Sequence, residues 1–303
     1  MPSLIPKFLS HGDKIALIAT ARKVSLTEME PAIKTLKSWG LQVIPGEHLY
    51  SIHHQFAGTD GERAMDLQTA IDDPDIKAII CARGGYGTAR ILDSVNLESL
   101  KKSPKWIIGF SDLTSLHCQL NQTGIATMHA VMPILFNEAG VENSLESLKN
   151  LLFGENINYK TSAHIHNKLG IGKGELVGGN LSVLHSIINT SSDIDLANKI
   201  LFIEDVDEYL YHIDRMMLHF KKSGRLKHLS GLIVGHFSSM KDNLIPFGTD
   251  ALEIIKEHIS EYDYPVCFGF PVGHAYDNVA LLCGANATLE VTDKEGLLVY
   301  EGF

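Results

Sequence analysis

The chain has 303 residues, of which 45% are hydrophobic, and a formal net charge of −10. A chain of this length can form two packed domains, and its acidic balance without any Lys/Arg cluster disfavours nucleic acid and anionic membranes as partners. No run approaches the roughly eighteen apolar residues of a membrane span, and the N-terminal residues lack a secretory pattern, so we expect a cytoplasmic protein.

Short apolar runs alternate with helical patterns in the first half of the chain. Strands are predicted over residues 14–20, 41–46, 76–85 and 105–110, and helices over residues 26–40, 62–73, 88–95 and 112–120. This alternation predicts a parallel sheet with helices on both faces. Ligands of such sheets bind beyond the carboxyl ends of the strands, so a site is expected after Thr20, Cys81 or Phe110.

The second half has a different character. Residues 150–172 are polar and without periodicity, which predicts a connection between domains. We place a first domain at residues 1–155, the connection at 156–169 and a second domain at 170–303. The second domain is predicted to be mixed, with helices at 181–188, 213–220 and 251–259, strands at 199–205 and 229–237, and a β-rich tail over 265–300.

Ser111 stands where a predicted strand meets a predicted helix, in the stretch KWIIGFSDLTSLH (residues 105–117). Serine is a favoured helix N-cap, and the local pattern Gly-x-Ser-Asp is not the Gly-x-Ser-x-Gly of hydrolase elbows. Taken alone, the stretch favours a cap. A nucleophile at this corner needs a base and a group that orients the base, both from elsewhere in the chain.

Glu204 and His274 are the candidates for those two partners. Glu204 lies at the end of an apolar strand, and the acids that follow it, Asp205, Asp207 and Glu208, are typical of a solvated turn. His274 lies in the Gly/Pro-rich loop GFPVGHAYDN, where a histidine is either a solvated loop residue or a functional one.

Two glycine-rich stretches offer backbone N–H groups to a ligand. CARGGYGTAR (residues 81–90) follows a predicted strand and can cradle an anion, but it fits neither a dinucleotide fingerprint nor a Walker loop. GELVGGNLSVL (residues 174–184) forms either a tight turn or a ligand-facing backbone. The four cysteines are far apart and no metal-ligand spacing occurs, so we expect neither cofactor nor metal.

These stretches together resemble the LD-carboxypeptidase family of serine peptidases, which includes murein tetrapeptide carboxypeptidases and microcin C immunity peptidases. Each motif is weak alone, but they occur in family order and span most of the chain. The segments that carry the resemblance are residues 56–93, 107–117 (IIGFSDLTSLH), 174–184 (GELVGGNLSVL), 202–220, 229–237 and 270–278 (FPVGHAYDN).

The resemblance implies an α/β fold with the active site in a cleft between two domains. A Rossmann-like N-terminal domain carries the serine, and a β-rich mixed α/β C-terminal domain carries the glutamate and the histidine. The resemblance also implies a homodimer.

Carried over position by position, the resemblance implies Ser111 as nucleophile, His274 as general base and then acid, and Glu204 as the group that orients His274. The backbone N–H groups of Asp112 and Gly85 would form the oxyanion hole. Candidates for substrate binding lie at strand or helix ends or in a loop shared with the family: Arg83, Tyr86, Asn180 and His129.

The implied reaction is hydrolysis of the L,D peptide bond that releases terminal D-alanine from cytoplasmic murein tetrapeptides during cell-wall recycling, through an acyl-enzyme. A small peptide is therefore the expected partner. The chain departs from the family at IATARKVS, where the family tends to have Ala-Pro-Ser-Gly. Arg22 in this loop either alters the mouth of the cleft or recognises a carboxylate.

Two alternatives remain open at this point. A microcin-immunity-type peptidase would cleave an aminoacyl-nucleotide analogue and would carry aromatic residues after the serine to stack a purine. Residues 137–175 contain only Phe153 and Tyr159 as aromatics, which favours murein peptides. A non-catalytic two-domain protein that binds a small ligand is the alternative of another class, and it gains if the serine, histidine and glutamate lie apart.

Overall fold

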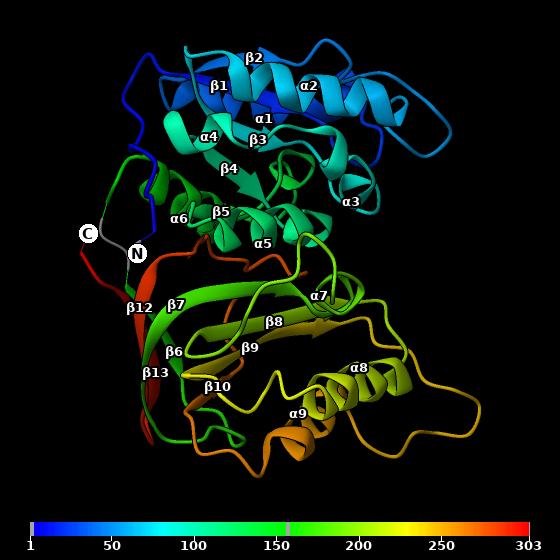
Figure 1. The fold of residues 1–303 in the computed structure, drawn as a ribbon, viewed down its shortest axis with the longest axis vertical. Coiled ribbons are helices and arrows are strands. Elements are labelled where there is room, and N and C mark those ends of the chain that lie inside the picture. Colours follow the sequence, from blue (N-terminus) through cyan, green and yellow to red (C-terminus); the bar gives the residue numbers. More distant parts are fainter. Residues whose placement is uncertain (1–2, 156–157, 303) are drawn as a thin grey trace.

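The computed structural model describes residues 3–155 and 158–302, which form two stacked lobes, each built around one sheet (Figure 1). The first lobe holds the N-terminal half of the chain. Its elements are β1 (Lys14–Ile18), α1 (Leu26–Ser38), β2 (Gln42–Pro45), α2 (Asp60–Asp72), β3 (Ile76–Cys81), α3 (Thr88–Ile91), η1 (Leu92–Ser94), α4 (Ser99–Lys102), β4 (Trp106–Gly109), η2 (Ser111–Leu113), α5 (Thr114–Gln122), β5 (Thr127–His129), η3 (Pro133–Leu135) and α6 (Glu142–Leu152), where η marks a 3-10 turn.

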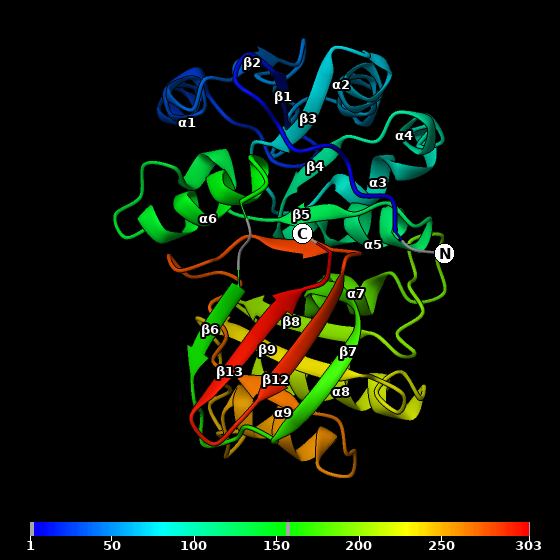
Figure 2. The same ribbon diagram turned by 90° about the vertical axis from the view of Figure 1, so that its left-hand side faces the viewer.

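The sheet of the first lobe has the strand order β11-β5-β4-β3-β1-β2, and β1 to β5 run parallel to one another. Helices α1 and α6 lie on one face of this sheet, and α2 and α4 lie on the other (Figure 2). Capping boxes start α1 and α2, with Ser25 paired to Glu28 and Thr59 paired to Glu62. The predicted parallel sheet with helices on both faces is confirmed.

The second lobe contains a mixed sheet with the order β10-β9-β8-β7-β12-β13-β6. Strands β7 to β10 pair in parallel, whereas β12, β13 and β6 are antiparallel. Its elements are β6 (Asn158–Ser162), β7 (Gly170–Asn180), α7 (Leu181–Ser186), β8 (Ile200–Val206), α8 (Leu210–Lys222), β9 (Gly231–Ser238), α9 (Ala251–Ile259), β10 (Val266–Phe268), β12 (Asn286–Val291) and β13 (Glu295–Tyr300), with β11 (Leu281–Cys283) leaving for the first sheet. This arrangement confirms the predicted fold class.

Two features differ from the expected course of the chain. Strand β11 leaves the C-terminal half and pairs antiparallel with β5 at the edge of the first sheet. The predicted connection 156–169 contains strand β6, and β7 begins at Gly170, directly after its predicted end; residues 156–157 lie outside the described residues. Glycine-rich β7 shows no apolar alternation, which hid it from pattern analysis. The proposed domain division stays a prediction.

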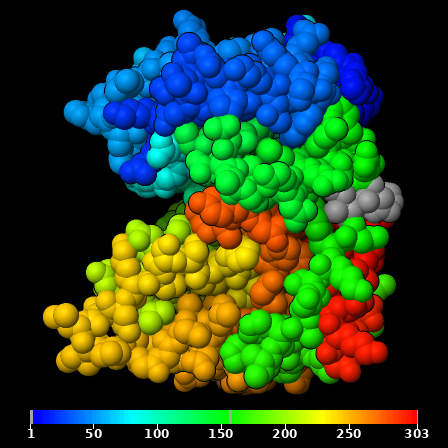
Figure 3. All heavy atoms as spheres, turned by 180° about the vertical axis from the view of Figure 1, so that it is seen from behind, coloured from blue at the N-terminus to red at the C-terminus, as the bar shows by residue number. Residues whose placement is uncertain are grey.

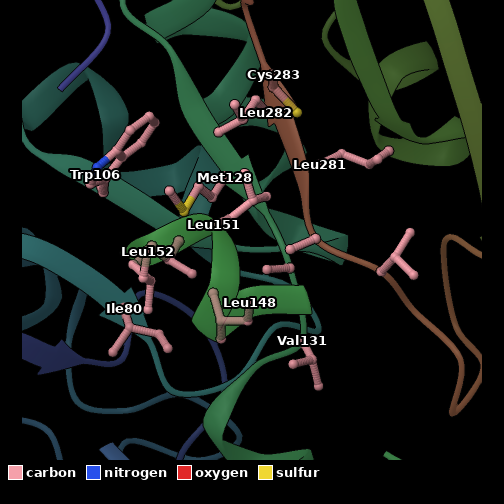
Figure 4. Close-up of a cluster of buried hydrophobic side chains, with 14 of the residues drawn as sticks. Ile80, Trp106, Met128, Val131, Leu148, Leu151, Leu152, Leu281, Leu282 and Cys283 are labelled. Atoms are coloured by element: carbon pink, nitrogen blue, oxygen red, sulfur yellow. The ribbon is translucent and has the colours of Figure 1, made fainter. Parts of the chain in front are cut away.

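The hydrophobic core continues from one lobe into the other. Figure 4 shows Leu281, Leu282 and Cys283 of β11 beside Met128 of β5, and all four side chains are buried. The same core cluster includes Phe202 of the second lobe. Shared apolar burial therefore ties the two lobes together. None of the helices in the described ranges is long and apolar enough to cross a lipid bilayer.

Candidate active site

Ser111 stands at the corner where β4 ends and the 3-10 turn η2 begins. It has a left-handed backbone conformation, with φ of +63°. For a residue other than glycine this costs on the order of 1 kcal/mol or more, and such strain gathers at functional sites. Its hydroxyl makes no capping bond to η2, where Phe110 is the cap residue. Ser111 Oγ lies instead 3.0 Å from Nε2 of His274, so the helix-cap alternative is set aside.

Glu204 and His274 meet Ser111 from the second lobe. Glu204 lies in β8, and His274 lies in the loop that follows β10. The Nδ1 atom of His274 is 2.7 Å from Oε2 of Glu204, and the His274 backbone N–H donates to the same oxygen at 3.3 Å. Gly273 makes this approach possible, because a Cβ there would stand 2.6 Å from Cβ of Glu204. Serine, histidine and glutamate thus form one continuous chain of hydrogen bonds.

The electrostatics of the site favour a basic imidazole. Burial opposes protonation of His274, but the adjacent Glu204 carboxylate outweighs it and raises the pKa of His274 above its ordinary value of 6.5. Glu204 itself is 0% exposed, so its charge acts on the ring with little screening by water. A buried carboxylate that accepts from Nδ1 also fixes the tautomer in which Nε2 can accept a proton.

Asp205 is a buried acid that the sequence analysis missed. It was assigned with its neighbours to a solvated turn, yet it is only 2% exposed. Its carboxylate accepts from the Asn180 side chain at 2.8 Å and from the Ser182 hydroxyl at 2.6 Å. Burial raises the pKa of Asp205 to about 6. The sequence offered one signal for this burial, because Asp205 directly follows Glu204 at the end of an apolar run.

The glycine loop after β3 lies against the serine corner. A Cβ on Gly84 would stand 3.1 Å from Cβ of Ser111, and Gly85 has φ of +109°. The buried Asp112 carboxylate accepts the backbone N–H of Thr88 at 2.8 Å, and burial raises its pKa. Asp112 therefore ties the glycine loop to the serine corner. Within the described ranges the N–H groups of Gly85 and Asp112 donate to no acceptor, so both can serve an oxyanion.

Arg83 and Tyr86 lie on the same loop but differ in their surroundings. The Arg83 guanidinium is 3.9 Å from the Glu28 carboxylate, so an acid of α1 already partners it. Tyr86 is 53% exposed, and its ring centroid is 6.3 Å from that of Phe56. Both residues are accessible to a ligand, and their roles in substrate binding stay predictions.

Asn180 and His129 are placed differently from what substrate binding requires. The Asn180 oxygen caps α7 by accepting the Val183 N–H at 3.1 Å, and its amide donates to Asp205, so its side chain is largely used within the protein. His129 is 0% exposed, and its ring packs edge-on against Phe202. The structure therefore corrects the expectation for His129, which has no surface for a substrate to touch.

The candidate triad lies where the two lobes meet. Ser111 comes from the first lobe, and Glu204 and His274 come from the second. The surface is hollowed between the blue and cyan lobe and the yellow lobe, beside an orange segment (Figure 3). The His274 side chain is 20% exposed, so water and substrate can reach its ring. Within residues 3–155 and 158–302, no group of three or more His, Cys, Asp or Glu side chains could hold a metal ion.

Both halves of the chain match models of one protein family. Residues 15–130 match the LD-carboxypeptidase N-terminal domain, and residues 173–289 match the LD-carboxypeptidase C-terminal domain. The chain belongs to the LD-carboxypeptidase family. It is thus a serine-type hydrolase of peptide bonds, as the resemblance implied.

Two relatives of this LD-carboxypeptidase show how far the similarity extends. A probable murein peptide carboxypeptidase of Bacillus subtilis is 35% identical over 97% of this chain and 93% of its own length. A murein tetrapeptide carboxypeptidase of Pseudomonas aeruginosa is 29% identical over 91% of this chain and 93% of its own length. The similarity to these two relatives therefore extends over most of both lobes.

Solved structures share the fold of this LD-carboxypeptidase. Muramoyltetrapeptide carboxypeptidase from Oxalobacter formigenes superposes with a TM-score of 0.88 at 30% identity, covering 96% of this chain and 99% of its own. The microcin C7 self-immunity protein MccF, in complex with aspartyl sulfamoyl adenosine, gives a TM-score of 0.87 at 21% identity, with 99% of each chain covered. At that identity the second likeness shows the fold alone.

Proposed function

We propose that this LD-carboxypeptidase releases the terminal D-alanine of murein tetrapeptides by cleaving the L,D peptide bond with a Ser111–His274–Glu204 triad. The observation that carries the proposal is the unbroken chain of contacts, 3.0 Å from Ser111 to His274 and 2.7 Å from His274 to Glu204. A non-catalytic binding protein has no need of such alignment, so the alternative of another class loses its support.

The acylation half-reaction begins with Ser111. Its Oγ attacks the scissile carbonyl carbon while Nε2 of His274 takes the hydroxyl proton, and the N–H groups of Gly85 and Asp112 bind the developing oxyanion. Glu204 stabilises the imidazolium that forms. His274 then gives its proton to the departing nitrogen, the C–N bond breaks, and D-alanine leaves with the peptide held as an ester on Ser111.

The deacylation half-reaction reverses these roles with water as nucleophile. His274 takes a proton from water, the resulting hydroxide attacks the ester carbonyl, and the same two N–H groups bind the oxyanion. The proton then returns to Ser111 Oγ as the C–O bond breaks. The shortened peptide is released and the triad is restored.

The choice of murein peptide over aminoacyl-nucleotide analogue draws on the named relatives and on two aromatic residues. Two relatives, at 35% and 29% identity, carry murein names, whereas MccF is only 21% identical. Tyr159 is buried and donates its hydroxyl to Ala280, and Phe153 packs beside His11. Both aromatics of residues 137–175 thus have partners within the protein, which favours murein peptides over a nucleotide.

We also propose a cytoplasmic location and a homodimer, in keeping with the family resemblance. A cytoplasmic enzyme would act on peptides that return from the cell wall. Light scattering of the purified protein would measure its mass in solution, and cell fractionation with an antibody to the chain would locate it.

The decisive experiment is a cleavage assay on two substrates. The purified protein is incubated with L-Ala-D-Glu-meso-diaminopimelate-D-Ala and, separately, with aspartyl sulfamoyl adenosine, and products are identified by mass. Release of D-alanine and of the tripeptide is expected from the first, with little cleavage of the second. Preferential cleavage of the sulfamoyl adenosine would overturn the proposed substrate, and cleavage of neither would overturn the proposed activity.

A further inference from the structure

Arg22 lies against the glycine loop on the opposite side from Ser111. A Cβ on Gly85 would stand 2.4 Å from Cδ of Arg22, so the stem of this arginine runs directly over Gly85. A Cβ on the preceding Gly84 would stand 3.1 Å from Cβ of Ser111. The Gly84–Gly85 pair therefore lies between the stem of Arg22 and the side chain of Ser111, so a cationic residue packs on the same glycine pair as the candidate nucleophile.

The backbone of Arg22 is held in place while its side chain is exposed. Its N–H donates to the Gly84 carbonyl at 3.4 Å, and an antiparallel bridge joins it to Phe56. The side chain itself is exposed to solvent. Anchoring at the backbone and packing of the stem reduce the entropy lost when the guanidinium binds a ligand.

The guanidinium of Arg22 has no anionic partner in the described part of the chain. The arginines of the segment CARGGYGTAR, Arg83 and Arg90, do have such partners. Arg83 is 3.9 Å from Glu28, and Arg90 donates to both carboxylate oxygens of Asp60. No hydrogen bond or ion pair within the described ranges includes the side chain of Arg22. Its five N–H donors are therefore available to an anion that arrives with the substrate.

An enzyme that removes a single C-terminal residue has to recognise a free carboxylate close to the bond it cleaves. In the leaving residue that carboxylate is attached to the Cα next to the scissile nitrogen, and successive Cα atoms are only about 3.8 Å apart. A guanidinium binds a carboxylate through two parallel hydrogen bonds, which a lysine cannot reproduce. The carboxylate-binding group thus has to lie close to the nucleophile, and Arg22 packs on the glycine pair that Ser111 also contacts.

We propose that Arg22 binds the free α-carboxylate of the substrate's terminal D-amino acid and thereby makes the enzyme an exopeptidase. This inference rests on the function proposed above and adds to it the residue that sets the position of cleavage. The loop IATARKVS departs from the Ala-Pro-Ser-Gly pattern by this cation. Arg22 is then a specificity residue that contacts substrate, without taking part in proton transfer.

The test compares two peptides that differ only at the C-terminus. The tetrapeptide with a free carboxylate and the same peptide with a C-terminal carboxamide are assayed with the wild-type enzyme and with Arg22→Gln. We expect Arg22→Gln to lower kcat/KM on the free acid by about 10- to 100-fold, mostly through KM, and to leave the carboxamide nearly unchanged. Arg22→Lys should recover part of the preference for the free acid.

The matched control is Arg90→Gln, which removes the same charge from an exposed residue of α3, after the glycine loop, and should keep the wild-type preference. An equal loss on both peptides with Arg22→Gln would overturn the inference, because Arg22 would then only support the loop. The inference would also be overturned if Arg83→Gln lost the preference for the free acid while Arg22→Gln kept it. If the wild-type enzyme cleaves neither peptide, the proposed function itself fails, a result distinct from these.

Discussion

Ser111 and His274 are 163 residues apart in the chain, yet Oγ of the serine lies 3.0 Å from Nε2 of the histidine. The contact joins the two lobes, because the serine follows β4 and the histidine follows β10. Separation of the lobes would lengthen this contact. The shared core that includes Leu281 and Phe202 therefore supports the candidate triad as well as the fold.

Removal of either end of this contact should abolish activity. Ser111→Ala and His274→Ala are each expected to lower kcat by about 10⁴-fold or more, since members of a triad act as one unit. Release of D-alanine measured by mass spectrometry provides the rate. Ser239→Ala is a matched control, because Ser239 is an exposed serine that also has a positive φ, +54°. Normal turnover by Ser111→Ala would contradict the assignment of the nucleophile.

The pH profile should report the ionisation of His274. A protonated His274 cannot accept the Ser111 proton, so kcat/KM is expected to fall as pH falls through its pKa, which lies above 6.5. Glu204→Gln removes the charge that raises this pKa while burial still opposes protonation. The acidic limb should then move to lower pH, and kcat should drop by about 10⁴-fold.

A second histidine–carboxylate pair provides the control for this profile. His258 and Asp214 are 2.8 Å apart and lie on α9 and α8, away from Ser111. Asp214→Asn is expected to leave the acidic limb where it is. If the acidic limb of the pH profile does not move in Glu204→Gln, Glu204 is not the partner of the catalytic base.

His117 should make the protein less stable in acid. Burial lowers the pKa of His117 to about 4, so between pH 6.5 and 4 the unfolded chain binds a proton that the folded chain does not. Stability therefore rises with pH across this window, by on the order of 3 kcal/mol in total. Buried His129 acts in the same direction, whereas Asp205, with a raised pKa, opposes it.

The comparison of wild type with His117→Gln isolates this contribution. Urea unfolding at pH values from 4 to 7 gives the free energy of unfolding of each protein. The variant should lose stability from the missing packing and the missing contact to the Gly109 carbonyl, but its pH dependence should be shallower. An identical slope in both proteins would show that His117 titrates normally in the folded state.

Gly273 should be intolerant of a side chain. At φ of +116°, alanine would be strained, and its Cβ would stand 2.6 Å from Cβ of Glu204. We expect Gly273→Ala to displace His274 from Glu204 and to lower kcat by about 10²-fold or more. Gly248→Ala provides the control, because Gly248 has a similar φ of +101° with nothing within 4 Å of its Cβ position. Equal activity losses in the two variants would assign the effect to backbone strain alone.

Local sequence patterns predicted most elements of this fold. The apolar runs of β1, β3, β4 and β8 and the helical patterns between them all depend on residues close together in the chain. The position of Ser111 at a strand-to-helix corner is a local property of the same kind. Segments that depend on distant partners were missed: β6 and β7 are polar or glycine-rich and form only because neighbouring strands supply their hydrogen bonds.

The sequence by itself determined the alternation of strands and helices and the family, because periodicity and the order of motifs are local properties of the chain. Through the family resemblance it also proposed Ser111, Glu204 and His274 as candidate catalytic residues. Only the tertiary structure decided which charges are buried or already paired. It buried Asp205 and His129, paired Arg83 with Glu28, and left Arg22 exposed beside Gly85. The physical reason is that burial and ion pairing depend on contacts between segments far apart in the chain, which no local pattern records.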